Sequence, residues 1–226
     1  MRALRLAAVS AVVAALAALP GPARAREGDE PVAFGLAGYL ALQRLNLGQL
    51  NQALTQAPDL PPYGWSAGYG VVFLPASGWG FASSDGTFRW ESRSGDTLSR
   101  LEIGHVQIGL VRRVLSRDRA AVTAGALVGL GSAELELVGS KPSVSPPGFD
   151  EFTMNRFTRH LLTLEVQLGL AWRVGPVGLL MVSAGYLVGT DFWSPGWAHP
   201  SGEVLPGLPG LLSGPGVRAA LVVGGG

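Results

Sequence analysis

The stretch Thr158–Trp172, TRHLLTLEVQLGLAW, alternates between apolar and polar side chains with a period of two residues. From Leu162 onward every even-numbered position is apolar, whereas Thr163, Glu165 and Gln167 occupy odd-numbered positions. A β-strand places alternate residues on opposite faces, but an α-helix would spread these polar groups around its surface. The length and the two unlike faces are typical of a strand that crosses a lipid bilayer, so the stretch predicts a membrane-crossing β-strand.

The same alternation recurs along the chain and predicts a sheet of eight strands. In chain order, the predicted strands are 32–41, 67–73, 79–91, 104–110, 120–130, 158–172, 180–189 and 217–223. The third of them contains Asp85-Gly86, a dipeptide that fits either a bulge or a hairpin turn. Because outer-membrane barrels of bacteria usually have an even number of strands, we interpret this segment as one long, bulged strand.

The connections between these strands alternate between long and short. The long connections are Leu42–Trp65, Ser92–Thr97, Gly139–Asn155 and Thr190–Pro215, and the short ones are Pro75–Gly78, Ser116–Arg119 and Val174–Val177. Tight turns on one side and extended loops on the other indicate an up-and-down barrel in a membrane. Within the first connection, Asn46–Gln56 has leucines at helical spacing and prolines after it. The predicted fold is therefore all-β, an eight-stranded antiparallel transmembrane up-and-down β-barrel with one short helix in the first long loop.

The N-terminus has the features of a secretory signal peptide. Two arginines precede an apolar run at positions 6–19, and Ala23-Arg24-Ala25 fits the small-x-small cleavage pattern. We expect residues 1–25 to be a cleaved signal peptide and residues 26–226 to form one outer-membrane β-barrel domain. Without the three arginines of the signal, 14 basic residues face 16 acidic ones, and this balance predicts no nucleic-acid partner.

Alternate positions on the predicted strands give two sets of candidate functional residues. The residues predicted to face lipid are Leu164, Val166, Leu168, Leu170, Leu180, Val182 and Tyr186. The residues predicted to form a polar network in the lumen are Tyr39, His105, Gln107, Thr123, Arg159, Thr163, Glu165, Gln167, Ser183 and Arg218. An eight-stranded barrel is just wide enough for side chains, so these groups should hydrogen-bond one another and plug the lumen.

Glu165 needs a cation in such an interior, because a buried carboxylate without a partner is costly. Arg159 lies about 20 Å away along the same strand. Arg218 or His105, from other strands, are therefore the better partners. A turn centred on Gly175-Pro176 further predicts that Gln167 lies opposite Ser183 and Leu168 opposite Val182.

Aromatic residues gather near the ends of the predicted strands. They are Trp65, Trp79, Phe157, Trp172, Phe192 and Trp193. This placement is typical of the aromatic girdles at membrane interfaces. In the last long connection, Trp193, Trp197 and His199 stand among prolines that stiffen the loop. Exposed aromatics on a stiff loop suit binding of an extracellular glycan or protein, so we assign these three to a surface-binding loop.

Two other classes of function stay open on the sequence. His199-Pro200-Ser201, followed by Glu203, has the two-residue His–Ser spacing found in barrel enzymes that deacylate lipid A. A secreted soluble β-barrel that binds an apolar ligand is the other class, although polar inward positions argue against it. Three scattered histidines without any cysteine predict no metal site, and no glycine-rich loop leads into a helix to hold a cofactor.

Through these strands and loops the mature chain resembles the small outer-membrane barrels of the OmpA transmembrane-domain and OmpX kind. The resemblance rests on pattern and not on a signature motif. It implies insertion in a bacterial outer membrane with membrane lipid as a partner, both termini periplasmic and the long loops outside. We expect a non-enzymatic barrel with a structural, surface-binding or limited small-solute passage role, in an oligomeric state that the sequence leaves open.

Overall fold

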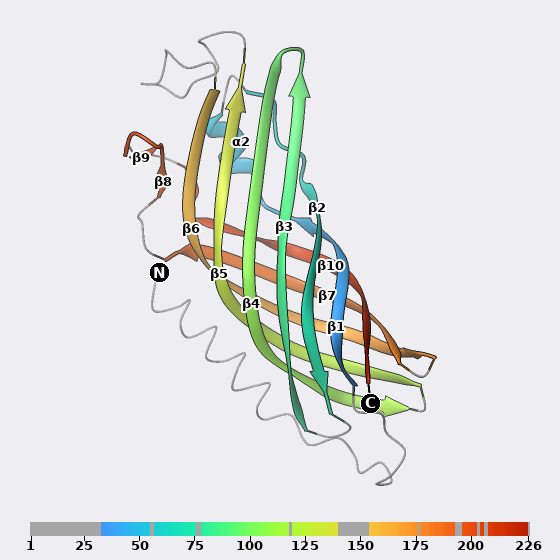
Figure 1. Cartoon of the computed structure of the whole chain (residues 1–226). Coiled ribbons are helices and arrows are strands. Elements are labelled where there is room, and N and C mark those ends of the chain that lie inside the picture. The colour runs from blue at the N-terminus through green and yellow to red at the C-terminus, as the bar shows by residue number, and fades with distance from the viewer. Residues whose placement is uncertain are drawn as a thin grey trace.

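The computed structural model describes residues 33–54, 57–75, 78–117, 119–139, 154–175, 177–192, 196–202, 204–205 and 208–225 (Figure 1). The expected signal peptide and its cleavage site lie outside these residues. The long strands in the described part of the chain are β1 (Ala33–Arg44), β2 (Tyr63–Leu74), β3 (Trp79–Ser94), β4 (Thr97–Arg117), β5 (Ala120–Val138), β6 (Met154–Val174), β7 (Gly178–Asp191) and β10 (Leu211–Gly225). The short elements are helix α2 (Gly48–Ala53) and strands β8 (Trp197–Ala198) and β9 (Val204–Leu205).

The eight long strands of the described residues form a closed antiparallel barrel. Each strand from β1 to β7 pairs with the next, and β10 pairs with both β7 and β1, which closes the ring. The predicted eight-stranded up-and-down barrel, with a short helix in the first long loop, is confirmed. No helix among the described residues is long and apolar enough to cross a membrane.

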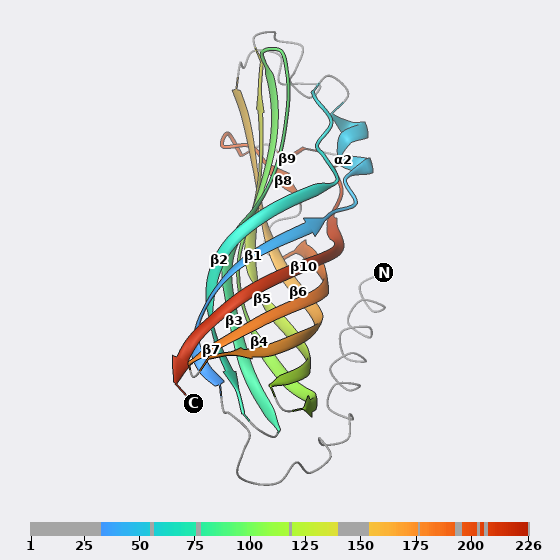
Figure 2. The ribbon, with the colours of Figure 1, turned by 90° about the vertical axis from the view of Figure 1, so that its right-hand side faces the viewer.

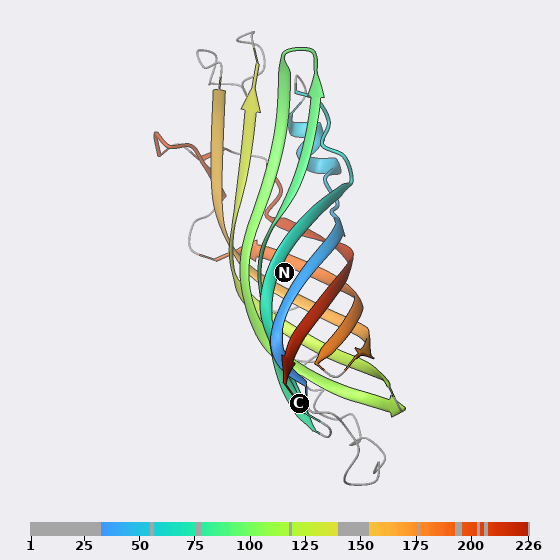
Figure 3. The same cartoon turned by 45° about the vertical axis from the view of Figure 1, so that its right-hand side comes forward.

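The strands differ in length, and this difference gives the barrel a tall side. Strands β3 to β6 have 16, 21, 19 and 21 residues, whereas β1, β2, β7 and β10 have 12, 12, 14 and 15. The upper parts of β3 to β6 therefore stand above the rest of the barrel as a four-stranded sheet, which we call the tall sheet (Figure 3). The short turns and the end of β10 lie at the opposite end of the barrel (Figure 1).

The tall sheet corrects one predicted connection. Ser92–Thr97 was expected to be a long loop, but β3 and β4 continue through it, pairing Ser94 with Thr97 around a two-residue turn. Gly95 adopts φ 57° in this turn, a conformation that favours glycine. The polar composition that suggests a loop belongs instead to the ends of β3 and β4 in the tall sheet, where the outward face of a strand is able to carry polar side chains.

Segments from two connections cover the inner face of the tall sheet. Helix α2 lies against the sheet at the top of the barrel (Figure 2), and its Leu50 is fully buried. The short β8–β9 hairpin pairs with β6 through Thr158 and Ala198. The hairpin extends the sheet beside β6, and its Trp197 side chain belongs to the same buried apolar cluster as Leu50.

Asp85-Gly86 lies inside one continuous strand, as expected, but without a bulge. The register of β3 with β4 is constant from Trp79 to Ser94. Gly86 is required for space, because a Cβ there would lie 2.2 Å from the Tyr39 hydroxyl. The irregularity occurs instead in β4, where the register against β5 shifts between Arg113 and Leu115.

The register of β6 with β7 also differs from the prediction. Gln167 lies opposite Gly185 and Leu168 opposite Ala184, so the ladder is displaced by two residues from the predicted pairing. The strands end at Val174 and Gly178, which makes the connection three residues long. Gly175 supplies the positive φ, 72°, that begins this turn.

The β6–β7 register can be measured with engineered cysteines, because the natural chain has none. The pair Leu168→Cys and Ala184→Cys should crosslink readily, since directly opposed Cβ atoms lie about 5 Å apart. The pair Leu168→Cys and Val182→Cys should crosslink far more slowly in the same refolded barrel. Faster crosslinking of the second pair would show that the register is the one predicted from the sequence.

Candidate functional site

The inward side chains fill the barrel in three layers. Near the short turns lies an apolar layer of Ala37, Val72, Leu74, Ala82, Val111, Leu127, Ala171 and Val222. A polar layer crosses the middle of the barrel. Above it lies a larger apolar layer, in which residues of the tall sheet pack against Leu45, Leu47, Leu50, Leu54, Leu60, Trp197 and Leu212. The interior of the described barrel is thus occupied by the protein's own side chains.

An ion pair lies at the centre of the polar layer. Arg218 Nη2 donates to Glu165 Oε2 at 2.9 Å, and both side chains are only 12% exposed. The Arg218 guanidinium also lies 4.6 Å from the centre of the Tyr39 ring. The prediction that Glu165 meets a cation from another strand is confirmed, and the cation is Arg218. The pair connects β6 with β10, which lie on either side of β7.

A chain of weaker hydrogen bonds extends from this pair. The Tyr39 hydroxyl lies 3.2 Å from Ser84 Oγ, which lies 3.3 Å from His105 Nε2. Separately, Gln107 Nε2 donates to Thr163 Oγ1 at 3.3 Å. Ser84 was not among the candidate residues, because polar side chains also occupy the odd positions Ser83, Asp85 and Thr87 of this strand and alternation alone does not show which face is inward.

The other predicted lumen residues also occupy inward positions. Thr123 is buried beside Gly169, where a Cβ would lie 2.8 Å from its hydroxyl. Gln167 and Ser183 are half-buried. The structure thus gives hydrogen bonds or ionic contacts within the polar layer for Tyr39, His105, Gln107, Thr163, Glu165 and Arg218.

Arg159 lies elsewhere. It is buried in the upper layer, where it donates to Asp191 and to the carbonyl oxygens of Pro209 and Gly210. Its guanidinium also lies 5.9 Å from the centre of the Trp197 ring. Arg159 therefore binds the last connection to the tall sheet. It takes no part in the central network, because it lies four residues above Thr163 on the same strand.

The assignment of Trp197 to a surface-binding loop is wrong. Its side chain is 0% exposed and belongs to the upper apolar layer, so it is unable to contact an external ligand. Phe157, predicted for the aromatic girdle, is also fully buried there. Both side chains lie on the concave side of the tall sheet, where residues of the last long connection cover them and exclude water. Trp193 lies outside the described residues, and His199 is partly exposed.

The outer face carries the predicted apolar residues. Leu168, Leu170, Leu180, Val182 and Tyr186 are exposed, with Leu168 at 65%, while Leu164 and Val166 are half-buried between neighbouring strands. Trp65, Trp172 and Phe192 are exposed near strand ends, and Trp79 is half-buried. Outward residues on most of the other long strands at this height are also apolar, among them Leu36, Leu40, Val106, Ile108, Val128, Leu130, Val217 and Leu221. These residues form an apolar belt that is interrupted on β3, where Ser83, Asp85 and Thr87 face outward and the Tyr69 hydroxyl donates to Asp85 at 2.9 Å.

Above the belt, the outer face of the tall sheet is charged. Arg89 pairs with Glu102 at 2.6 Å, and Arg100 bridges Glu91 and Glu136 at 3.0 Å each. A further pair joins Arg156 and Glu134 at 3.0 Å. The hydrogen bond with Glu91 raises the pKa of the Arg100 guanidinium above its ordinary value. Cross-strand pairs of opposite charge favour the sheet modestly, and they mark the part of it that lies in water.

His199 and Ser201, the candidate catalytic pair, do meet. His199 Nδ1 lies 2.9 Å from Ser201 Oγ, and the Ser201 backbone N–H donates to the same nitrogen at 3.2 Å. The Gly202 N–H also donates to the His199 carbonyl oxygen at 2.8 Å, which closes a tight turn. Such side chain-to-backbone contacts form locally in turns without any catalytic requirement. Glu203 lies outside the described residues.

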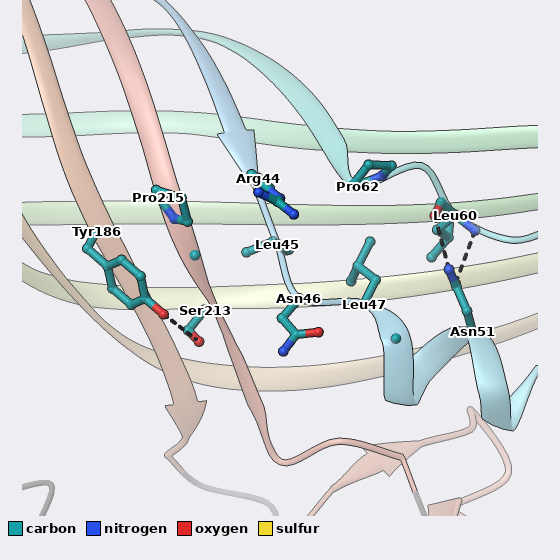
Figure 4. Close-up of a pocket in the computed structure, with 12 residues that line it drawn as sticks. Arg44, Leu45, Asn46, Leu47, Asn51, Leu60, Pro62, Tyr186, Ser213 and Pro215 are labelled. Carbon is teal, nitrogen blue, oxygen red and sulfur yellow. Dashed lines mark hydrogen bonds between the residues drawn. The ribbon is translucent and has the colours of Figure 1, made fainter.

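A groove opens on the outer rim between the top of β1 and the tops of β10 and β7 (Figure 4). Its volume is about 460 Å³. It is lined by Arg44, Leu45, Asn46, Leu47, Gly48, Asn51, Leu60, Pro62, Tyr186, Ser213, Gly214 and Pro215. No cluster of three or more potential metal-ligating His, Asp or Glu residues occurs in the described part of the chain.

No protein-family model matches the chain, and no curated protein matches its sequence. Among solved structures, Neisserial surface protein A is 14% identical and aligns with 84% of this chain and 96% of its own, at a TM-score of 0.51. Ail, the attachment invasion locus protein of Yersinia pestis, is 16% identical over 85% of this chain and 98% of its own, with a TM-score of 0.47. A major outer membrane protein of Thermus thermophilus is 11% identical over 84% and 99%, with a TM-score of 0.44. The closed ladder and the likeness to the Neisserial protein give this chain the fold of a small outer-membrane β-barrel.

The central ion pair generates a stability prediction. Glu165→Gln keeps the side-chain shape but leaves the nearly buried Arg218 without its counter-charge, so the barrel should lose about 3–5 kcal/mol of unfolding free energy. The double variant with Arg218→Gln should recover part of this loss, because no unpaired charge remains. Urea titration of refolded protein measures both, and an unchanged midpoint for Glu165→Gln would refute the role of the pair.

Proposed function

We propose that this protein is an integral outer-membrane barrel that does not form a wide channel and that displays its tall sheet on the cell surface. The observation behind the proposal is the outer face, which changes from an apolar belt to an ion-paired sheet along the same strands. On β4, Val106, Ile108 and Leu110 are exposed and apolar, whereas Arg100 and Glu102 above them are ion-paired. A solvent boundary between lipid and water accounts for this change.

The height of the belt agrees with a bilayer. On β6 the apolar outward positions run from Leu162 to Trp172, ten residue steps, which span about 33 Å along a strand. At a strand tilt of about 40° this length projects to about 25 Å, the height of the apolar band of outer-membrane barrels. Exposed apolar surface of this extent would be a severe aggregation liability in water. The belt therefore favours a membrane over the alternative of a secreted soluble barrel.

The filled lumen supports a structural or surface-binding role in place of bulk transport. Two apolar layers enclose the polar layer, and α2 and the last connection cover the upper end. Among the described residues, side chains occupy the interior of the barrel where a soluble ligand would have to bind. Binding of a glycan or protein would then use the charged outer face of the tall sheet and the long connections, with Trp197 excluded as a contact residue because it is buried.

Deacylation of a lipid stays the alternative function, because His199 and Ser201 are in hydrogen-bond contact. The contact is within one exposed turn, and it falls above the apolar belt, since its segment pairs with β6 at Thr158. A nucleophile that attacks an acyl ester would need to reach the lipid face. For this reason the surface role is the favoured proposal.

Membrane insertion is tested by placing an arginine at two outward positions. Leu168→Arg in the belt should lower the unfolding free energy by about 2–4 kcal/mol in lipid vesicles. Ser132→Arg, an exposed outward position on β5 within the tall sheet, should change it by less than about 0.5 kcal/mol. Refolding titrations in phosphatidylcholine vesicles provide the comparison. Equal small effects at the two positions would contradict insertion through this belt.

A further inference from the structure

The rim groove lies where the regular ladder of the barrel's closing seam ends. The β1–β10 ladder ends at the pair of Gln43 and Gly216, but β10 continues upward against β7 as far as Leu211. Above this point the first connection follows β2 instead, since the Leu45 N–H donates to the Pro62 carbonyl oxygen at 3.0 Å. The groove lies over this part of the seam, between the top of β1 and the tops of β10 and β7 (Figure 4).

Two hydrogen bonds join the two sides of the seam beneath the groove. Gln43 Nε2 donates to the Gly214 carbonyl oxygen at 2.6 Å. The Asn46 N–H donates to the Ser213 carbonyl oxygen at 3.1 Å. The groove is thus a formed feature of the rim, because its walls are bonded to each other at its base.

The charge of the groove favours an anion. Its lining contains one cation, Arg44, and no carboxylate. Arg44 is exposed, lies 5.9 Å from the centre of the Tyr63 ring, and forms no ion pair with the described residues. This contrasts with Arg89, Arg100, Arg156, Arg159 and Arg218, which all face a carboxylate. A guanidinium without a carboxylate partner, in a groove that hydroxyl and amide groups also line, is suited to a phosphate.

The position of the groove next to the apolar belt suits an occupant that also has a hydrocarbon part. Leu42 and Val217, next to it on β1 and β10, are exposed on the belt below, and Tyr186 lines both the groove and the belt. The Tyr186 hydroxyl points toward Ser213 Oγ at 3.4 Å, at the polar end of the site. Leu45, Leu47 and Leu60 also line the groove, but their side chains are buried in the upper apolar layer, so the apolar surface offered to an occupant is that of Leu42, Val217 and Tyr186. An occupant should therefore have a phosphate at the rim and hydrocarbon along the belt.

We propose that the rim groove binds the phosphate headgroup of a lipid in the outer leaflet, with the lipid's acyl chains lying along β1, β10 and β7. Arg44 binds the phosphate, Asn46 and Ser213 offer further donors, and the exposed belt residues receive the chains. The cavity volume lies within the range usual for small-ligand sites. The inference rests on the proposed insertion of the barrel in a membrane.

The test uses the full mature chain in dodecylmaltoside micelles, with dilauroyl phosphatidic acid as the probe and native mass spectrometry to count bound lipid. Arg44→Gln should weaken binding of the first lipid by about tenfold or more, the loss expected for a hydrogen-bonded charged partner. Arg117→Gln, which removes another exposed arginine at the opposite end of the barrel, is the matched control and should bind within about twofold of the natural chain.

Three results would overturn the inference. They are unchanged binding by Arg44→Gln, an equal loss in Arg117→Gln, and complete displacement of the lipid by millimolar inorganic phosphate, which would identify the site as one for a free anion. Each variant is first checked for a heat-modifiable shift on a gel, the sign of a folded barrel. A variant that folds but keeps its lipid refutes the groove alone, whereas failure of the natural chain to fold into micelles or vesicles refutes the proposed membrane barrel.

Discussion

Closure of the backbone hydrogen-bond ladder is the constraint on which the rest of this structure depends. A chain whose outer face is hydrocarbon has no water with which to satisfy free N–H and C=O groups, so every strand edge within the belt must be paired. The β1–β10 pairing, from Phe34 opposite Gly225 to Gln43 opposite Gly216, supplies the last set of these bonds. Above Gly216 the seam stays bonded, because the side chain of Gln43 donates to the Gly214 carbonyl oxygen and the Asn46 N–H donates to the Ser213 carbonyl oxygen.

Closure with eight strands in turn decides what the interior is able to hold. A ring of this size has room only for side chains, and the chain fills that room with layers of unlike chemistry. The polar layer is satisfied at its centre by Glu165 and Arg218, whose attraction is strengthened by the scarcity of water around them. Small residues make space where a large one enters. The Tyr39 ring occupies the space that a Cβ of Gly68 or Gly86 would need.

Local alternation was sufficient to predict the strands, their faces and the closed barrel, because each strand is buried on one side only. It was insufficient for the register of β6 with β7. A displacement by two residues keeps every side chain on its face, so Gln167 is inward opposite either Ser183 or Gly185 and the hydrophobic pattern is unable to distinguish them. Trp197 and Arg159 were misassigned for another reason. Their environment is created by a connection that folds back onto the tall sheet, which depends on contacts distant in sequence.

The same tertiary contacts explain why the strands pass beyond the belt. Ion pairs on the outer face and an apolar layer on the inner face stabilise the tall sheet where lipid no longer surrounds it. The structure is thus a single continuous sheet with two environments outside and a filled interior throughout.

Planar-bilayer recording of the purified, refolded protein tests this account most directly. A closed ladder of eight strands around a filled lumen predicts no steady conductance above the leakage of the bare bilayer, at any applied voltage that leaves the membrane intact. A stable, ohmic conductance of porin size would contradict it, because such a current requires a continuous water-filled path through the layers that these side chains occupy.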